Sequence, residues 1–78
     1  MTLKNIKDVK RFQNTINKCK DDVWLMSDHE QYNLKSMLSQ LVAIGKVISG
    51  DKSLELFTSV KDDEQYFLKM FSEHPEML

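Results

Sequence analysis

The sequence predicts one α+β domain of the open-faced sandwich type, with three helices packed on one face of a small three-stranded antiparallel sheet. Three observations lead to this prediction. The 78 residues suffice for one hydrophobic core but not for two. Apolar residues recur at helical spacing in three segments and alternate or cluster as in strands between them. The resulting order α β β α β α contains no repeat and no low-complexity linker, so residues 1–78 are read as a single domain.

The first predicted helix has an apolar face and a basic outer face. Asn5 precedes it and is expected to act as its N-cap, and Asp8 lies near its positive end. Its apolar residues recur at intervals of three and four: Ile6, Val9, Phe12, Ile16 and Cys19.

A β-hairpin is expected next. Residues 23–26, VWLM, are strand formers, residues 27–31 form the turn, and residues 32–34 begin the return strand. Ser36 then precedes a second helix and is expected to cap it by accepting a backbone hydrogen bond, while Gly45 is expected to close it. The apolar residues at helical spacing are Met37, Leu38, Leu41, Val42 and Ile44.

Residues 49–53 are a loop by composition, and residues 54–60, LELFTSV, alternate with the period of a strand. The last helix is expected to start in the acidic residues 62–64 and to end at or before Pro75. Its apolar residues are Tyr66, Phe67, Met70 and Phe71.

The composition excludes several classes of function. No apolar run is long enough to cross a bilayer, so no membrane insertion is expected. A single cysteine, Cys19, and the absence of a signal-peptide stretch favour the cytoplasm. No catalytic constellation is present, so the protein is expected to be neither an enzyme nor a cofactor carrier. His29, between Asp28 and Glu30, is interpreted as part of a solvated turn and not as a metal site.

The charge is unevenly distributed. The net charge is −1, yet residues 1–20 contain six basic residues against one acidic residue. A solvated helix face is the favoured interpretation, because specific nucleic-acid binding usually requires a more basic domain with polar or aromatic readers. Binding of nucleic acid through the basic first helix, with Lys7, Lys10 and Arg11, is kept as an alternative.

The element order, together with "YNLKSML" at residues 32–38, resembles the HPr family, the phosphocarriers of bacterial sugar phosphotransfer systems. "DVWL" at residues 22–25 is similar to that family's second strand. "LELFTSVKDDEQYFLKMF" at residues 54–71 is similar to its last strand, acidic turn and last helix. The resemblance covers nearly the whole chain and implies an HPr-like open-faced sandwich.

One departure bears directly on function. In the family, a histidine at the start of the first helix carries the phosphoryl group, within a Gly-Ile-His-Ala-Arg-Pro motif. The matching stretch here is "KNIKDV", which places Asn5 at the histidine, Lys7 at the arginine and Asp8 at the proline. A carboxamide nitrogen is not a nucleophile at neutral pH, so histidine phosphotransfer is expected to be lost.

A second departure concerns the sheet. Only four residues precede Asn5, and they span at most about 14 Å. The family's first strand is therefore expected to be missing, which would leave open the edge of the strand at 54–60, where the resemblance places it. An open edge predicts a homodimer formed through it. Trp24, Met26 and Phe57 are expected to face away from the helices, as an apolar contact surface.

The resemblance also implies a regulatory role for Ser36, since the serine of this motif is phosphorylated in many family members. The alternative is that Ser36 only caps the helix. In the regulatory case, Met37 and Leu38 would provide the apolar surface on which a protein partner docks. The sequence thus favours a non-catalytic, HPr-like regulatory or protein-binding module, with a genuine phosphocarrier as the alternative.

Overall fold

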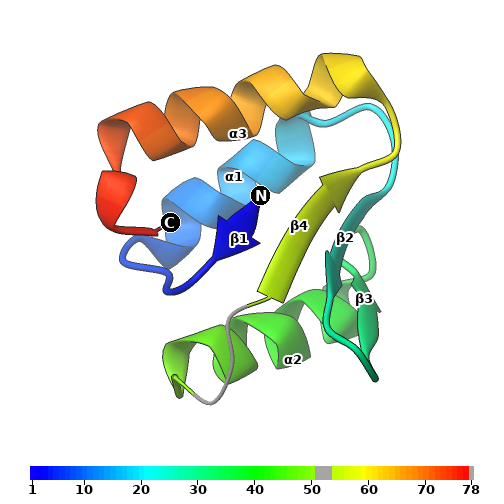
Figure 1. Cartoon of the computed structure of the whole chain (residues 1–78). Coiled ribbons are helices and arrows are strands. Elements are labelled where there is room, and N and C mark those ends of the chain that lie inside the picture. Colours follow the sequence, from blue (N-terminus) through cyan, green and yellow to red (C-terminus); the bar gives the residue numbers. More distant parts are fainter. Residues whose placement is uncertain (51–53, 78) are drawn as a thin grey trace.

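The computed structural model describes residues 1–50 and 54–77 (Figure 1). These residues form an α+β fold with a four-stranded antiparallel sheet, three α-helices and a short 3-10 turn. The elements in chain order are β1 (Thr2–Leu3), α1 (Val9–Lys18), β2 (Val23–Met26), β3 (Gln31–Asn33), α2 (Met37–Ile48), β4 (Leu54–Thr58), α3 (Lys61–Glu73) and η1 (Pro75–Met77). The predicted fold class is confirmed, and the strand count is four instead of three.

The sheet has the order β1-β4-β2-β3, with every neighbouring pair antiparallel. β2 and β4 form its centre, where Leu25 pairs with Leu56 and Trp24 with Phe57. Since side chains alternate between the two faces of a strand, Leu25 and Leu56 point to the helical side and Trp24 and Phe57 to the other. The predicted alternation is therefore confirmed in both central strands.

The expected open edge of β4 is wrong. Thr2 pairs with Glu55 and Leu3 with Leu54, and the backbone of Met1 exchanges hydrogen bonds with that of Leu56. Four residues are too few for a long strand and its loop, but two of them suffice for a short strand that continues directly into the loop before α1. The free edges of the sheet then belong to β1 and β3, which span two and three residues.

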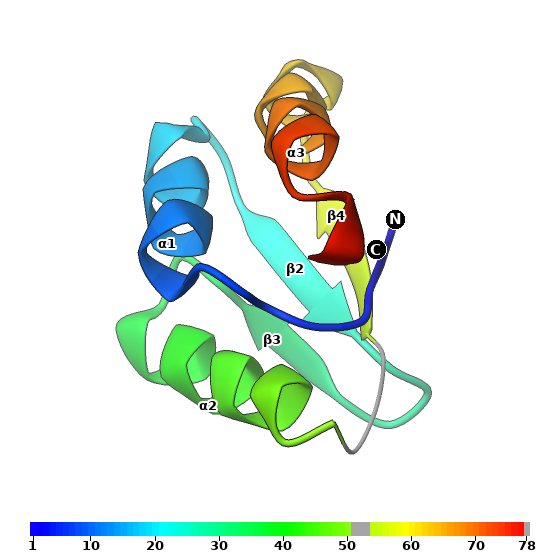
Figure 2. The ribbon, with the colours of Figure 1, turned by 90° about the vertical axis from the view of Figure 1, so that its left-hand side faces the viewer.

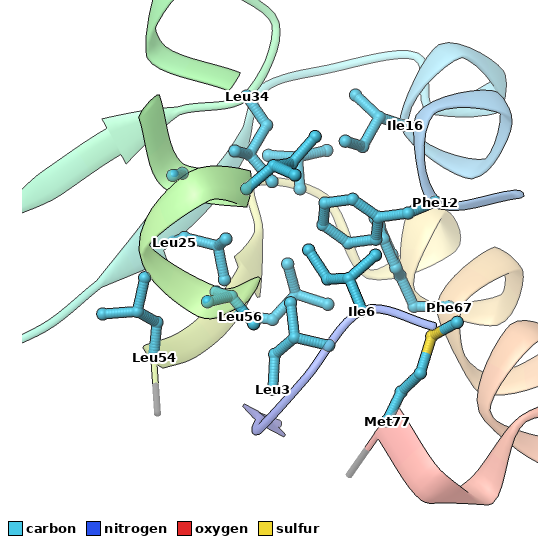
Figure 3. Packing of buried hydrophobic residues seen from close by; sticks show 14 of the residues in the cluster. Leu3, Ile6, Phe12, Ile16, Leu25, Leu34, Leu54, Leu56, Phe67 and Met77 are labelled. Carbon is cyan, nitrogen blue, oxygen red and sulfur yellow. The ribbon is translucent and has the colours of Figure 1, made fainter. Parts of the chain in front are cut away.

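All three helices lie on the same side of the sheet, and Figure 2 views the molecule from that side. Buried side chains from every helix and from the inner face of the sheet form one core. Figure 3 shows Phe12 of α1 beside Phe67 of α3, with Ile6, Leu25 and Leu56 completing this part of the core. The centroids of the two phenyl rings are 6.3 Å apart and the ring planes are inclined at 58°, within the range of favourable aromatic pairs.

The chain termini are joined through the loop before α1. The Lys4 amide donates to the Met77 carbonyl at 2.9 Å, and the Asn5 side chain donates to the Glu76 carbonyl at 2.6 Å. Leu3 and Met77 are fully buried in the core. The short first strand is thus paired with β4, and the residues that follow it are hydrogen-bonded to η1.

α2 ends later than the sequence predicts. Gly45 lies inside the helix, which continues to Ile48. The glycine that follows its end is Gly50, whose φ of 76° lies in the left-handed region that favours glycine at this position. The loop expected at 49–53 includes residues 51–53, which lie outside the described residues.

Replacement of Leu3 by alanine tests whether β1 is an integral part of the fold. Because Leu3 is fully buried, the Leu3→Ala variant should lose about 2–5 kcal/mol of unfolding free energy, measured by urea denaturation. The neighbouring exposed Lys4 is the control, and Lys4→Ala should change stability by less than about 0.5 kcal/mol. Equal stabilities of the two variants would contradict an integral β1.

Candidate functional site

The N-terminus of α1, where the resemblance places a phosphoryl carrier, is closed by Asp8. Asp8 is the N-cap residue, and its side chain accepts a hydrogen bond from the Arg11 amide at 2.9 Å. The predicted cap, Asn5, lies three residues earlier, in the loop after β1. The expectation that Asn5 caps α1 is therefore wrong, because the loop needs these residues to cross from the sheet edge to the helix.

Asn5 itself is fixed by the C-terminal end of the chain. Its side-chain nitrogen donates to the Glu76 carbonyl, and its side-chain oxygen is buried without a hydrogen-bond partner among the described residues. A carboxamide held in this way has a structural role and presents no reactive atom.

Neither histidine lies at the start of α1. His29 lies in the turn between β2 and β3 and is exposed. His74 follows α3, and its Nδ1 lies 3.2 Å from a carboxylate oxygen of Glu76. A phosphoryl group on this imidazole would meet like-charge repulsion from the Glu76 carboxylate.

Ser36 precedes α2 as predicted, but its hydroxyl makes no capping hydrogen bond. The turn is held instead by Asn33, whose side chain accepts from the Lys35 amide and whose carbonyl accepts from the Ser36 amide, each at 3.0 Å. Ser36 is exposed. Its hydroxyl is therefore accessible and is not needed by the helix.

The amine of Lys35 is directed to α1 and away from the start of α2. It donates to the carbonyls of Ile16 at 2.9 Å and Cys19 at 2.6 Å, at the C-terminal end of α1. A cation at this end of a helix satisfies unpaired carbonyls and opposes the helix dipole. The Lys35 amine is thus engaged at α1 and not at the hydroxyl of the neighbouring Ser36.

Most of the exposed large apolar side chains among the described residues lie on α2. Five of its side chains form what we call the α2 patch, each between 50% and 77% exposed: Met37, Leu38, Leu41, Val42 and Ile48. With about 100° of rotation per residue, the patch covers an arc of about 140° around the helix, facing away from the core. The apolar spacing predicted this helix correctly. Of the five apolar residues from which it was predicted, however, only Ile44 is buried.

A different set of residues holds α2 on the sheet. Gln40, Ala43, Ile44 and Val47 are buried, and Gln40 is only 5% exposed. Its side-chain nitrogen donates to the Leu34 carbonyl and its oxygen accepts from the Gln13 side chain, each at 3.0 Å. Sequence reasoning missed Gln40, because a glutamine in a helix is usually exposed.

The outer face of the sheet carries a second, smaller apolar surface. Trp24 and Met26 are half-buried, whereas Phe57 is exposed. α2 lies on the other face of the sheet (Figure 1). The structure therefore separates the predicted partner residues into two surfaces, with Met37 and Leu38 on one and Trp24, Met26 and Phe57 on the other.

The acidic start of α3 holds another buried polar group that the sequence did not reveal. Asp63 is 1% exposed, and its two oxygens accept from the Lys20 and Asp21 amides at 3.0 Å each. Burial, and secondly the Asp63 carboxylate, raises the pKa of the Cys19 thiol to about 11. The thiol is therefore protonated at neutral pH and is a poor nucleophile.

The basic face of α1 is partly used within the molecule. Arg11 forms an ion pair with Glu73 of α3, whereas Lys7 and Lys10 are exposed. Among residues 1–50 and 54–77, no three His, Cys, Asp or Glu side chains are grouped as a metal site would require. No helix in the same residues is long and apolar enough to cross a bilayer.

Comparisons of this chain with protein-family models, with curated proteins and with solved structures find no match. The assignment of a function therefore depends on the geometry of the described residues.

The two helix caps differ in a way that mutagenesis can measure. Because Asp8 caps α1 through its side chain, Asp8→Ala should lower the unfolding free energy by about 1 kcal/mol. Ser36→Ala, at the equivalent position of α2, should change it by less than about 0.5 kcal/mol, since no capping bond is lost. Urea denaturation of the two variants measures this difference, and a larger loss at Ser36 would contradict the described geometry.

Proposed function

We propose that this chain is a non-catalytic protein-binding module on an HPr-like scaffold, and that the α2 patch is its docking surface. One observation carries the proposal: five large apolar side chains of one helix are each at least half exposed on one face. Large contiguous apolar surfaces on folded domains commonly mark interaction sites. Burial of such side chains is the main driving force of protein association.

The arrangement of the strands supports the HPr-like scaffold. The resemblance placed a first strand of the family beside residues 54–60, and β1 occupies that position next to β4. The hairpin, the helix after Ser36 and the final helix also follow the order that the resemblance implied. The protein partner and action in the cytoplasm belong to the same proposal.

The surroundings of α1 favour a binding function over phosphotransfer. The Asp8 carboxylate lies at the helix N-terminus, where a phosphate would otherwise be stabilised by free amides and the helix dipole. A second anion there would meet like-charge repulsion. The pairing of Arg11 with Glu73 also removes a cation from the alternative nucleic-acid surface.

Ser36 is well placed to regulate docking on the α2 patch. Its uncapped hydroxyl directly precedes Met37 and Leu38, which are 64% and 77% exposed. A phosphate at Ser36 would meet the free amides of the first turn of α2 and would add a negative charge beside the apolar surface. Phosphorylation would thus change the affinity of the patch for a protein partner.

Substitutions on the patch test the docking function. Immobilised wild-type protein should retain a specific partner from native cytosol, and Leu38→Gln/Leu41→Gln should lose at least about 90% of it, because the apolar contact is replaced by polar groups. The measurement is quantitative mass spectrometry of the retained proteins.

The control is Leu68 on α3, a leucine outside the patch whose exposure of 52% matches that of Leu41 at 51%. Leu68→Gln should retain the partner as the wild type does. Equal retention by the wild type and the double variant would refute docking on α2.

Phosphorylation by phosphotransfer enzyme I separates the proposed binding module from the phosphocarrier alternative. As a binding module, this protein should stay unlabelled on incubation with enzyme I and phosphoenolpyruvate, since the position of the carrier is occupied by the amide of Asn5. A phosphocarrier would become labelled. The readout is acid-labile phosphate per chain, with a histidine-containing HPr as the positive control. A stoichiometric label that disappears in His29→Ala or His74→Ala would establish a phosphocarrier.

A further inference from the structure

We propose that the occupant of the α2 patch is a second copy of this chain, with the two α2 helices packed antiparallel about a two-fold axis level with Ala43. The proposal rests on the proposed function, because it names the partner of the same surface. It differs from a dimer formed through the sheet edge, which β1 largely occupies.

The order of residues in α2 is self-complementary for this arrangement. In an antiparallel pair, positions equally distant from the axis lie opposite each other. Leu38 and Ile48 each lie five residues from Ala43, and Leu41 and Gly45 each lie two residues from it. Each copy therefore offers Leu38 to Ile48 of the other and Leu41 to Gly45 of the other, as a two-fold interface requires.

Gly45 supplies the space that this packing needs. It lies within the helix and in the middle of the patch face. Apart from its chain neighbours and the adjoining helix backbone, no atom of the described residues lies within 4 Å of where its Cβ would be. A glycine inside a helix is less favourable than alanine, and nothing in the described fold requires one here. A leucine of a second helix can approach the bare backbone closely at this position.

The charges of α2 are compatible with contact between two copies. Lys46 is the only charged residue of the helix, and its amine pairs with Glu30 at 3.0 Å. No like charges on the patch would therefore be brought together. The antiparallel arrangement also places the positive end of one helix dipole beside the negative end of the other.

The exposed area suits a weak dimer. The five side chains expose roughly 300 Å² of apolar surface per copy, from their exposed fractions and the area of a large apolar side chain. With the usual share of polar surface, the contact would bury on the order of 1,000 Å² in total, the lower limit of specific interfaces. A dissociation constant on the order of tens of micromolar is therefore expected.

The other surfaces offer less to a second copy. The free sheet edges are only two and three residues long, and short edge strands are poor templates for strand addition. Among the three apolar residues on the outer face of the sheet, Phe57 is 47% exposed, while Trp24 and Met26 are half-buried and offer less surface for contact.

Sedimentation equilibrium between about 5 and 500 µM tests the proposal. The wild type should form a dimer, and Leu38→Gln should weaken it at least about tenfold. Gly45→Ala should weaken it at least about fivefold while raising the Tm by about 2–6 °C, since alanine improves the helix but fills the space for the partner's leucine. Phe57→Gln, the control on the sheet face, should leave the dimer unchanged.

The geometry is tested by disulfide trapping. A mixture of the Leu38→Cys and Ile48→Cys variants should cross-link on mild oxidation, because these positions lie opposite each other. Either variant alone should not, since two equivalent positions would be about 15 Å apart along the helices, beyond the reach of a disulfide. The wild type, with its buried Cys19, is the control for background oxidation.

A monomeric wild type at 500 µM would overturn the proposal, and so would a dimer that Gly45→Ala or Leu38→Gln leaves intact. Neither result refutes the proposed function as long as the patch substitutions still abolish retention of another protein. Conversely, a dimer that needs the patch would stand even if no other protein is retained. The two experiments can therefore refute the dimer and the docking function independently of each other.

Discussion

The hydrogen bonds of the buried Gln40 side chain help to fix how α2 is rotated on the sheet, and the exposure of the α2 patch depends on this rotation. The side chain is nearly inaccessible, donates to the Leu34 carbonyl and accepts from Gln13. A buried amide that loses its partners costs on the order of 1–3 kcal/mol. A rotation by one residue, about 100°, would break both hydrogen bonds. Ala43, Ile44 and Val47 therefore face the core, while larger apolar side chains remain outside.

Polar side chains satisfy backbone groups at both ends of α1 and before β2. Asp8 satisfies the start of α1, Lys35 satisfies its end, and Asp63 binds the amides that lead into β2. The starts of α2 and α3 have no side-chain capping bond, and the cap residue of α2, Ser36, is exposed and carries a hydroxyl. Ser36 thus directly precedes the α2 patch, and this proximity is the physical basis for our proposal that modification of the serine would change association.

Residues with a local pattern could be interpreted from the sequence. Leu25 and Leu56 alternate with Trp24 and Phe57, and a strand requires that these pairs face opposite sides. Phe12 and Ile16 follow the helical period and are fully buried. The class of fold follows from such patterns, because hydrophobic periodicity and secondary structure share the same geometry.

Residues whose role depends on distant partners could not be interpreted in this way. Asp8 rather than Asn5 caps α1, because β1 pairs with β4 and the loop then spans residues 4–8. Gln40 is buried only because Gln13 and Leu34 lie beside it. The apolar spacing of Met37, Leu38 and Leu41 indicates a helix, but hydrophobicity alone places these side chains in the core. Their exposure follows from the rotation of α2 that the hydrogen bonds of Gln40 help to fix. Hydrophobic periodicity does not reveal that this glutamine is buried.

The most direct test of this account is the solvent exposure of individual methyl groups on α2. Relaxation of methyl NMR signals by a soluble paramagnetic gadolinium chelate can be measured in dilute protein. The account predicts strong relaxation of the Leu38, Leu41, Val42 and Ile48 methyl groups, together with protection of those of Ile44 and Val47. The reverse pattern, with Leu38 and Leu41 protected in the dilute monomer, would mean that α2 buries its most apolar face and would contradict the account.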